Sequence, residues 1–81
     1  METRVAVIGI IVQNTGSVEA LNALLHEYRD GIIGRMGLPY REKSINIVSI
    51  AIDAPNETIS ALSGKIGKLD GVSAKVAYAP L

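Results

Sequence analysis

Two stretches of the chain are apolar on both sides rather than at alternate positions. The first runs from residue 4 to residue 12 as RVAVIGIIV, and the second runs from 45 to 53 as INIVSIAID. A strand that alternates has one face in water, whereas a strand with apolar residues toward both faces is buried on both. We therefore predict strands at 4–12 and 45–53 that are covered on both faces.

A helical pattern follows each of these strands. Segments 17–29 and 59–69 carry an apolar residue every three or four positions, which gives one apolar face each. The Asp53-Ala-Pro-Asn56 turn supplies helix-start chemistry for the second helix, because Pro is tolerated in a first helical turn. Asp30-Gly31 and Asp70-Gly71 end the helices, glycine being suited to the left-handed position there. The residues of the two faces are Val18, Leu21, Leu24, Leu25 and Tyr28, and Ile59, Leu62, Ile66 and Leu69.

Two further strands are weaker in pattern. Ile32–Leu38 predicts a second strand that is interrupted by Gly34 and Gly37, and Pro39–Ser44 predicts a polar loop. Val72–Ala79 alternates cleanly between apolar and polar residues and predicts a last strand.

The two halves of the chain repeat one another at an offset of about forty residues. Apolar positions of the first strand fall opposite apolar positions of the third, and Asp30-Gly31 falls opposite Asp70-Gly71. Each half reads strand, helix, strand, so the whole reads βαββαβ, the ferredoxin-like arrangement. Right-handed crossovers place both helices on one face of a four-stranded antiparallel sheet. We predict an α+β fold in a single domain, 1–81, with the first and third strands in the middle.

The uncovered face of this sheet predicts self-association. Both central strands carry apolar side chains toward both faces, with small residues between them at Ala6, Gly9, Ser49 and Ala51. A monomer normally exposes no contiguous apolar patch larger than roughly a few hundred Å². We predict a homo-oligomer, a dimer or a tetramer, held through the sheet face or a sheet edge. The alternative is a thermostable monomer with a high apolar content.

Composition removes several chemistries. The 81 residues include no Cys and one His, so disulfides, thiolate zinc and iron–sulfur ligation are excluded. A single His argues against a transition-metal site, and we expect no metal and no cofactor. Eight Lys and Arg balance eight Asp and Glu, whereas proteins that bind nucleic acid on their own usually carry a basic excess. We therefore expect no direct DNA or RNA binding.

The chain shows no feature that directs it to a membrane. Its apolar runs are all shorter than the roughly 20 residues that span a bilayer. Met1–Arg4 carries mixed charge and leads straight into a strand, which is unlike a signal peptide. We expect a cytoplasmic protein.

Two segments carry candidate binding chemistry. The turn Gln13–Ser17 precedes a helix N-terminus, where free amides and the helix dipole favour anions, so Asn14, Thr15, Gly16 and Ser17 could hold a carboxylate or an amino-acid backbone. The alternative is that these residues only cap the helix. Arg35, Tyr40 and Arg41 lie around the predicted hairpin and suggest a contact patch for a partner, because Tyr and Arg are favoured in interface hot spots. The alternative is a solvated loop.

Other short patterns do not indicate catalysis. Gly64-Lys-Ile-Gly67 matches the GXXG of KH domains but falls inside the second predicted helix, where we interpret the glycines as allowing close helix packing. His26 lies on the polar face of the first helix, with no second His and no carboxylate pair. We find no catalytic residue set and predict that the chain is no enzyme.

The assembled pattern resembles two regulatory families. The first is the ACT domain, a βαββαβ amino-acid sensor that works as an oligomer and binds effector near the turn after its first strand. In this chain that turn holds Asn14, Thr15, Gly16 and Ser17. The second is the C-terminal domain of the nickel-responsive regulator, which tetramerises through the same fold.

Four segments are similar to a third family, the iron-only hydrogenase system regulators, and together they extend over most of the chain. IIGRMGLPYREK at 32–43 is the most specific of them, and RVAVIGIIV, Asp53-Ala-Pro55 and Leu62-Ser-Gly-Lys65 accompany it. The resemblance implies a regulatory role in an iron-only hydrogenase system. We therefore expect a non-catalytic, oligomeric, ACT-like domain that senses a small-molecule effector or binds a protein partner. The alternative is a ligand-free protein-interaction or scaffold module.

Overall fold

A computed structural model describes residues 2–80, so Met1 and Leu81, the two ends of the predicted domain, lie outside the described residues. Each half of the chain forms a strand, a helix and a second strand, which confirms the predicted βαββαβ order. Short 3₁₀ turns lie at Thr15–Ser17, Arg29–Gly31 and Arg41–Lys43. The six main elements are β1 (Arg4–Val12), α1 (Val18–Glu27), β2 (Ile32–Tyr40), β3 (Ile45–Ala54), α2 (Asn56–Gly67) and β4 (Val72–Tyr78).

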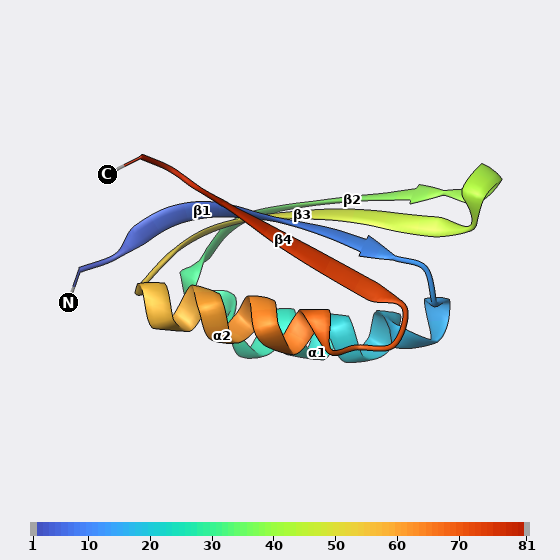
Figure 1. Ribbon diagram of the computed structural model, residues 1–81, viewed down its shortest axis with the longest axis horizontal. Coiled ribbons are helices and arrows are strands. Elements are labelled where there is room, and N and C mark those ends of the chain that lie inside the picture. Colours follow the sequence, from blue (N-terminus) through green and yellow to red (C-terminus); the bar gives the residue numbers. More distant parts are fainter. Residues whose placement is uncertain (1, 81) are drawn as a thin grey trace.

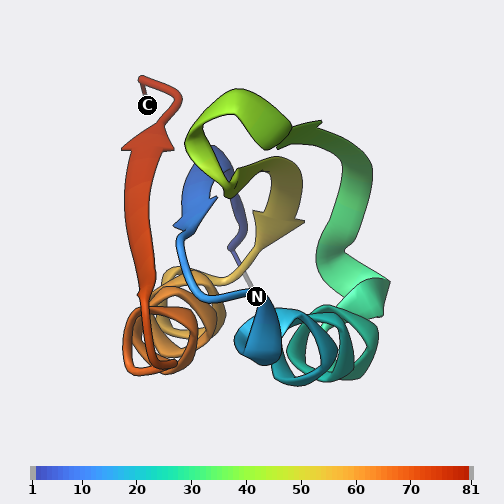
Figure 2. The same ribbon diagram turned by 90° about the vertical axis from the view of Figure 1, so that its right-hand side faces the viewer.

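The four strands form one antiparallel sheet in the order β2-β3-β1-β4, with the first and third strands in the middle as predicted. Both helices lie on the same side of this sheet (Figure 1). Viewed from the end, α1 lies below β2 and α2 lies below β4 (Figure 2). The ferredoxin-like fold is therefore confirmed, and within residues 2–80 only one face of the sheet is covered by helices.

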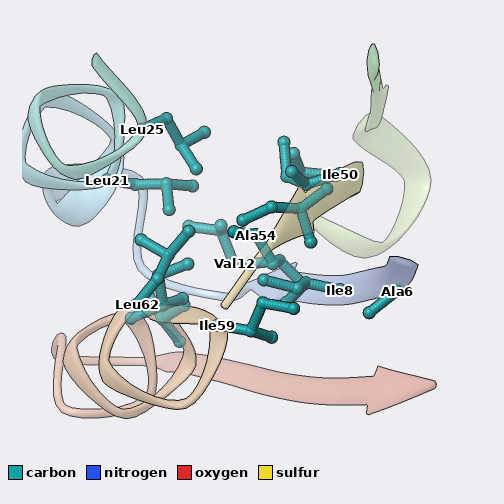
Figure 3. Close-up of a cluster of buried hydrophobic side chains, with 14 residues drawn as sticks. Ala6, Ile8, Val12, Leu21, Leu25, Ile50, Ala54, Ile59 and Leu62 are labelled. Carbon is teal, nitrogen blue, oxygen red and sulfur yellow. The ribbon is translucent and has the colours of Figure 1, made fainter. Parts of the chain in front are cut away.

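The hydrophobic core fills the space between the sheet and the helices (Figure 3). Alternate side chains of β1 and β3 point into it, and Ile8, Ile10, Ile50 and Ile52 are fully buried. Burying such a side chain contributes about 1.5–3 kcal/mol to folding. The helices contribute Leu21, Leu25, Ile59, Leu62 and Ile66. Leu69, which we assigned to the second helix, follows its end at Gly67 but still packs against this core.

The boundaries of the second strand and the first helix differ from prediction. β2 continues through Pro39 and Tyr40, so the loop is limited to residues 41–44. Pro39 is tolerated because β2 is an edge strand that pairs only with β3, and an edge strand has a side without ladder hydrogen bonds. The first helix spans 18–27 rather than 17–29, because its flanking residues form tighter 3₁₀ turns.

Three glycines, Gly31, Gly64 and Gly67, do not have the role that the sequence predicted for them. Gly71 has φ +68°, as predicted, but Gly31 does not take the left-handed conformation. Gly31 is instead packed closely, since a Cβ there would lie 3.1 Å from the Cβ of Ala54. The interpretation of Gly64 and Gly67 is wrong, because beyond the adjacent residues and the backbone of the helix itself no atom lies within 4 Å of a Cβ built at either position. These two glycines do not allow close packing within the described residues.

Over residues 2–80, no helix combines the length and apolar character that crossing a membrane requires. The expected cytoplasmic location stays a prediction.

Candidate functional site

The turn Gln13–Ser17 is tied to the turn that precedes β4. The Gln13 amide donates to the Gly71 carbonyl at 2.7 Å, and the Ser17 hydroxyl donates to the Asp70 carbonyl at 2.6 Å. The Asn14 amide Nδ2 donates to the Asp70 carboxylate, also at 2.6 Å. Ser17 is buried by these contacts. The two turns therefore form one connected end of the molecule.

Asn14 also organises the start of the helical segment. Its Oδ1 accepts a hydrogen bond from the Gly16 amide at 2.9 Å, and its carbonyl accepts one from the Ser17 amide. This is the capping role that was weighed against effector binding. Asn14 and Ser17 thus have internal partners, whereas Thr15 and Gly16 are exposed to solvent at the same turn.

A cavity of about 270 Å³, which we call the end cavity, adjoins this turn. Val12 and Val18, which flank the turn in sequence, both line it. Its walls combine apolar side chains with the polar groups of Asn22, Arg35 and Asn46. Small-molecule sites have this mixed character, an apolar wall with a few polar groups. Their volumes start at roughly 300 Å³, so the end cavity is close to the lower limit.

The structure separates the three residues of the predicted contact patch. Arg35 pairs with Ile50 across the strands and so lies on the helix side, where its Nη2 donates to Asn22 Oδ1 at 2.7 Å. Tyr40 pairs with Ile45 and lies on the opposite face, and Arg41 is exposed in the 3₁₀ turn at the hairpin tip. Tyr40 and Arg41 therefore lie together at the tip of the hairpin, while Arg35 lies on the helix side of the sheet.

The sheet face opposite the helices is almost entirely apolar. Residues directly opposite each other on paired strands share a face, and the register aligns Met36 with Ser49 and Gly9, and Leu38 with Ile47 and Ile11. Within residues 2–80 no helix covers these side chains (Figure 1). We define the open face as Val5, Val7, Gly9, Ile11, Met36, Leu38, Tyr40, Ile45, Ile47, Ser49, Ala51 and Ala77.

Exposure on the open face is high for such residues. Val7 is 44% exposed, Leu38 is 53% exposed and Met36 is 61% exposed. Asp53 and Lys75 lie on the same face at its margin, by their pairing with Val5 and Gly9. The open face is thus a mainly apolar surface, with Ser73 and one charge of each sign at its margin.

Charged groups elsewhere show little coupling. Among residues 2–80 the single ion pair joins Lys65 Nζ to Glu27 Oε2 at 3.5 Å, and no three His, Asp or Glu side chains gather where they could hold a metal. Contact with Tyr28, and then the charge of Glu27, raises the pKa of Lys65. Lys65 also lies 5.1 Å from the centre of the Tyr28 ring. These groups connect α1 to α2 at the surface.

A family model described as "Iron-only hydrogenase system regulator, putative" matches residues 4–76. The chain belongs to the TM1266-like family. The match includes every strand and both helices of the fold, apart from the last two residues of β4. The family's description is that of a regulator, as the sequence resemblance implied.

A solved structure of the TM1266-like family agrees closely with this one. The uncharacterized protein TM1266 from Thermotoga maritima is 34% identical and superposes with a TM-score of 0.93, covering 98% of this chain and 100% of that one. A "Putative nickel-responsive regulator" from Saccharolobus solfataricus is 32% identical over 66 residues, or 82% of this chain. The chain spans about half of that relative's length, 49%.

Two more distant structures share only the fold with this TM1266-like chain. A formyltetrahydrofolate deformylase from Pseudomonas putida is 13% identical with a TM-score of 0.65, covering 94% of this chain and 29% of that one. The de novo designed protein Foldit4 is 23% identical with a TM-score of 0.63, covering 99% of each chain.

The sequence did not predict that Asp70 is a hydrogen-bonding partner of the turn at 13–17. Its carboxylate and its carbonyl both accept hydrogen bonds from the predicted effector residues. The sequence held a partial signal, because Asp70-Gly71 had already been recognised as the end of the second helix. Pairing that end with the turn at 13–17 requires the sheet register, which no local pattern contains.

Proposed function

We propose that this chain is a non-catalytic regulatory module of an iron-only hydrogenase system, that it works as an assembly of at least two copies, and that it responds to a small-molecule effector. The family description supports the regulatory role. The single observation that carries the assembly is the exposed apolar open face. The turn at 13–17 and the adjoining end cavity support the effector.

A second copy of the chain is the occupant that best fits the open face. Small residues at its centre, Gly9, Ser49 and Ala51, let another backbone approach closely. The two charges at its margin, Lys75 and Asp53, have opposite signs, so two copies can meet without a net like-charge contact. Interfaces between identical chains are more apolar than other surfaces, which matches this composition.

The hairpin of β2 and β3 is the part of the open face that extends furthest from the helices. It reaches further along the long axis of the molecule than the helices do (Figure 1), and Met36 and Leu38 of β2 are exposed on it. A projecting arm with apolar side chains buries little surface in one copy. Contact with a second copy would remove these side chains from water, and this burial favours association by roughly 25 cal/mol per Å² of apolar area.

The effector would bind where the turn meets the end cavity. Thr15 and Gly16 are exposed to solvent at the start of the helical segment, and the end cavity, lined by Val12 and Val18 on either side of the turn in sequence, supplies an apolar wall. The positive end of the α1 dipole lies at this turn and favours a carboxylate. An amino acid or a similar small metabolite is the ligand class with this chemistry.

A second candidate function is a ligand-free interaction module. It is favoured by the exposed hairpin tip, where Tyr40 and Arg41 lie next to each other. Arg35 contributes a separate contact in this account, on the helix side of β2. In this alternative the assembly only stabilises the fold, and the partner is another protein.

A thermal-shift panel of amino acids and central metabolites separates the two functions. A ligand present at 100 times its dissociation constant adds about 2.7 kcal/mol to the free energy of unfolding. We expect at least one such ligand, and we expect Asn14→Ala with Ser17→Ala to abolish its shift. A panel without any shift would contradict effector sensing and favour the interaction module.

The controls for this panel follow from the hydrogen bonds of the turn. Ser17→Ala removes a partly buried hydrogen bond and should lower the free energy of unfolding by about 1 kcal/mol without ligand, so each shift is measured from the variant's own baseline. Ser60→Ala, at an exposed position of α2, is the matched control and should respond like the parent protein. A ligand response that survives the changes at Asn14 and Ser17 would place the effector elsewhere.

A further inference from the structure

A basic groove lies between α1 and β2. It has a volume of about 420 Å³ and is open to solvent. Three of its lining side chains are Arg29, Arg35 and His26, and none is a carboxylate. The full lining, which we call the α1–β2 groove, is Asn22, Leu25, His26, Arg29, Ile32 and Arg35.

Both arginines are held in place by neutral acceptors. Arg35 Nη2 donates to Asn22 Oδ1 at 2.7 Å, and Arg29 Nη1 donates to the His26 carbonyl at 2.9 Å. In the part of the chain that the structure describes, neither guanidinium lies within 4.0 Å of a carboxylate oxygen. Each side chain is therefore oriented while its full positive charge stays uncompensated. A guanidinium has five N–H donors, and the contacts above use one on each arginine.

The charges near the C-terminal end of α1 are sorted by sign. Glu27 and Asp30 line a different cavity of about 340 Å³, next to Gly31. Arg29 and Asp30 are neighbours in sequence but line different cavities. In a chain with equal numbers of acidic and basic residues, this sorting leaves the α1–β2 groove with a local excess of positive charge.

We propose that the α1–β2 groove binds a small molecule that carries a phosphate or carboxylate group on an apolar body. Guanidinium groups bind both kinds of oxyanion with two parallel hydrogen bonds. Leu25 and Ile32 form the apolar part of the groove and would pack against the rest of the ligand. The groove shares Asn22 and Arg35 with the end cavity, but it goes beyond the proposed effector position because His26 and Arg29 line the groove alone.

An NMR titration of the backbone amides tests this site directly. Phenyl phosphate, inorganic phosphate and benzoate are added at constant ionic strength to the labelled full chain. We expect saturable shifts at His26, Ile32 and Arg35, with a dissociation constant for the better aromatic ligand of about 1 mM or lower. Phenyl phosphate should bind more tightly than inorganic phosphate, because only the former reaches the apolar wall.

The comparison of phenyl phosphate with benzoate distinguishes the two oxyanions. Tighter binding of phenyl phosphate identifies a phosphate ester as the ligand class, and tighter binding of benzoate identifies a carboxylate. Either result supports the shared chemistry. Shifts that do not saturate with any of the three probes would overturn the proposal.

Variants at the two arginines give the matched test. Arg29→Gln and Arg35→Gln should each weaken binding about tenfold, while Lys68→Gln, the same loss of charge at an exposed site beyond α2, should leave it unchanged. Equal weakening by all three variants would mean that only overall charge matters and would overturn the site. If a Gln variant fails to fold, Arg29→Lys keeps the charge but loses the paired hydrogen bonds, and binding should still weaken severalfold.

Failure here is distinguishable from failure of the effector proposal. The effector response depends on Asn14 and Ser17, and Arg29→Gln should leave it intact. Loss of groove binding alone would therefore leave the proposed function standing, and the reverse also holds.

Discussion

The central strand β1 carries apolar side chains toward both faces of the sheet, but the two faces have opposite surroundings. On β1, Ile8 and Ile10 are 0% exposed beneath the helices, while Val5 and Val7 on the other face are 45% and 44% exposed. The side chains differ little in chemistry, so the difference lies in what covers them. We therefore expect a strand that is apolar on both faces to be covered on both, and the fold of one copy covers only one face.

The internal repeat shows that this double-sided character belongs to both halves. Val7 and Ile47, forty positions apart, lie on the open face, and Ile10 and Ile50, also forty apart, lie in the core. An offset by an even number of residues keeps each side chain on its face, because the strand period is two. Both central strands thus contribute equally to the open face.

The largest effect is expected from shortening a side chain of the covered face. Ile10→Ala removes atoms from a fully buried position and leaves a cavity, which should cost about 2–5 kcal/mol of unfolding free energy. Val7→Ala, on the same strand but on the open face, should cost about 0.5 kcal/mol or less in the dilute monomer. Urea unfolding at low protein concentration measures both.

Protein concentration sharpens this contrast. At higher concentration the parent protein should gain apparent stability through association, and Val7→Ala should gain less. Equal losses for Ile10→Ala and Val7→Ala in the dilute monomer would contradict the description of two unlike faces.

The second largest effect is expected from placing a charge on the open face. Val7→Glu puts a carboxylate into the proposed interface in every copy, and like charges brought together there should weaken association by about 100-fold or more. The monomer should remain folded, because Val7 is partly exposed in one copy. Sedimentation measures the association constant, and circular dichroism checks the fold.

Ala61→Glu is the matched control for this variant. It introduces the same charge at an exposed position of α2, on the other side of the sheet. Association should be unchanged. A loss of association equal to that of Val7→Glu would place the interface on the helices instead.

A smaller effect, of opposite sign, is expected on α2. Gly64 lies in the middle of a helix with open space around a Cβ, so Gly64→Ala should raise the unfolding free energy by about 0.5–1 kcal/mol through helix propensity alone. Thermal or urea unfolding measures the gain. A loss of stability would reveal a close contact at Gly64 in the assembly and would show that the helix layer is also covered.

The smallest effect is expected at the surface contact between the helices. The pKa of Lys65 is raised above its ordinary value of 10.5. The contribution of Lys65 to the free energy of unfolding is therefore complete below pH 10.5 and is lost only as the pH rises through the pKa of the folded state. Stability-against-pH curves of the parent protein and Lys65→Met should therefore run parallel from about pH 6 to about pH 9. A divergence within that window would show that Lys65 has a partner beyond Tyr28 and Glu27.

Most of the fold was predictable because its signals are local or periodic. The β1 bounds, the βαββαβ order and the central place of β1 and β3 all follow from apolar patterns and the repeat. The end of β2 was not predictable from Pro39, since its tolerance depends on a free sheet edge. Gly31 and Gly71 occupy equivalent places in sequence, yet only Gly71 is left-handed, and both are packed closely against a neighbouring segment.

The candidate sites were less predictable, because they depend on contacts between distant segments. The turn at 13–17 could be found from its residues, but its hydrogen bonds to Asp70 bridge more than fifty positions. Arg35 was grouped with Tyr40 by sequence distance, whereas the strand period and the sheet register place the two on opposite faces. The α1–β2 groove joins a helix to a strand edge, and no local pattern indicates it.

Sedimentation velocity of the unmodified protein, from about 1 μM to about 100 μM, tests the central claim most directly. If the open face is covered by a second copy, the protein should sediment as two or more copies of the 8.6 kDa chain, and Val7→Glu should sediment as one. A parent protein that sediments as a single 8.6 kDa chain over the whole range would contradict the account.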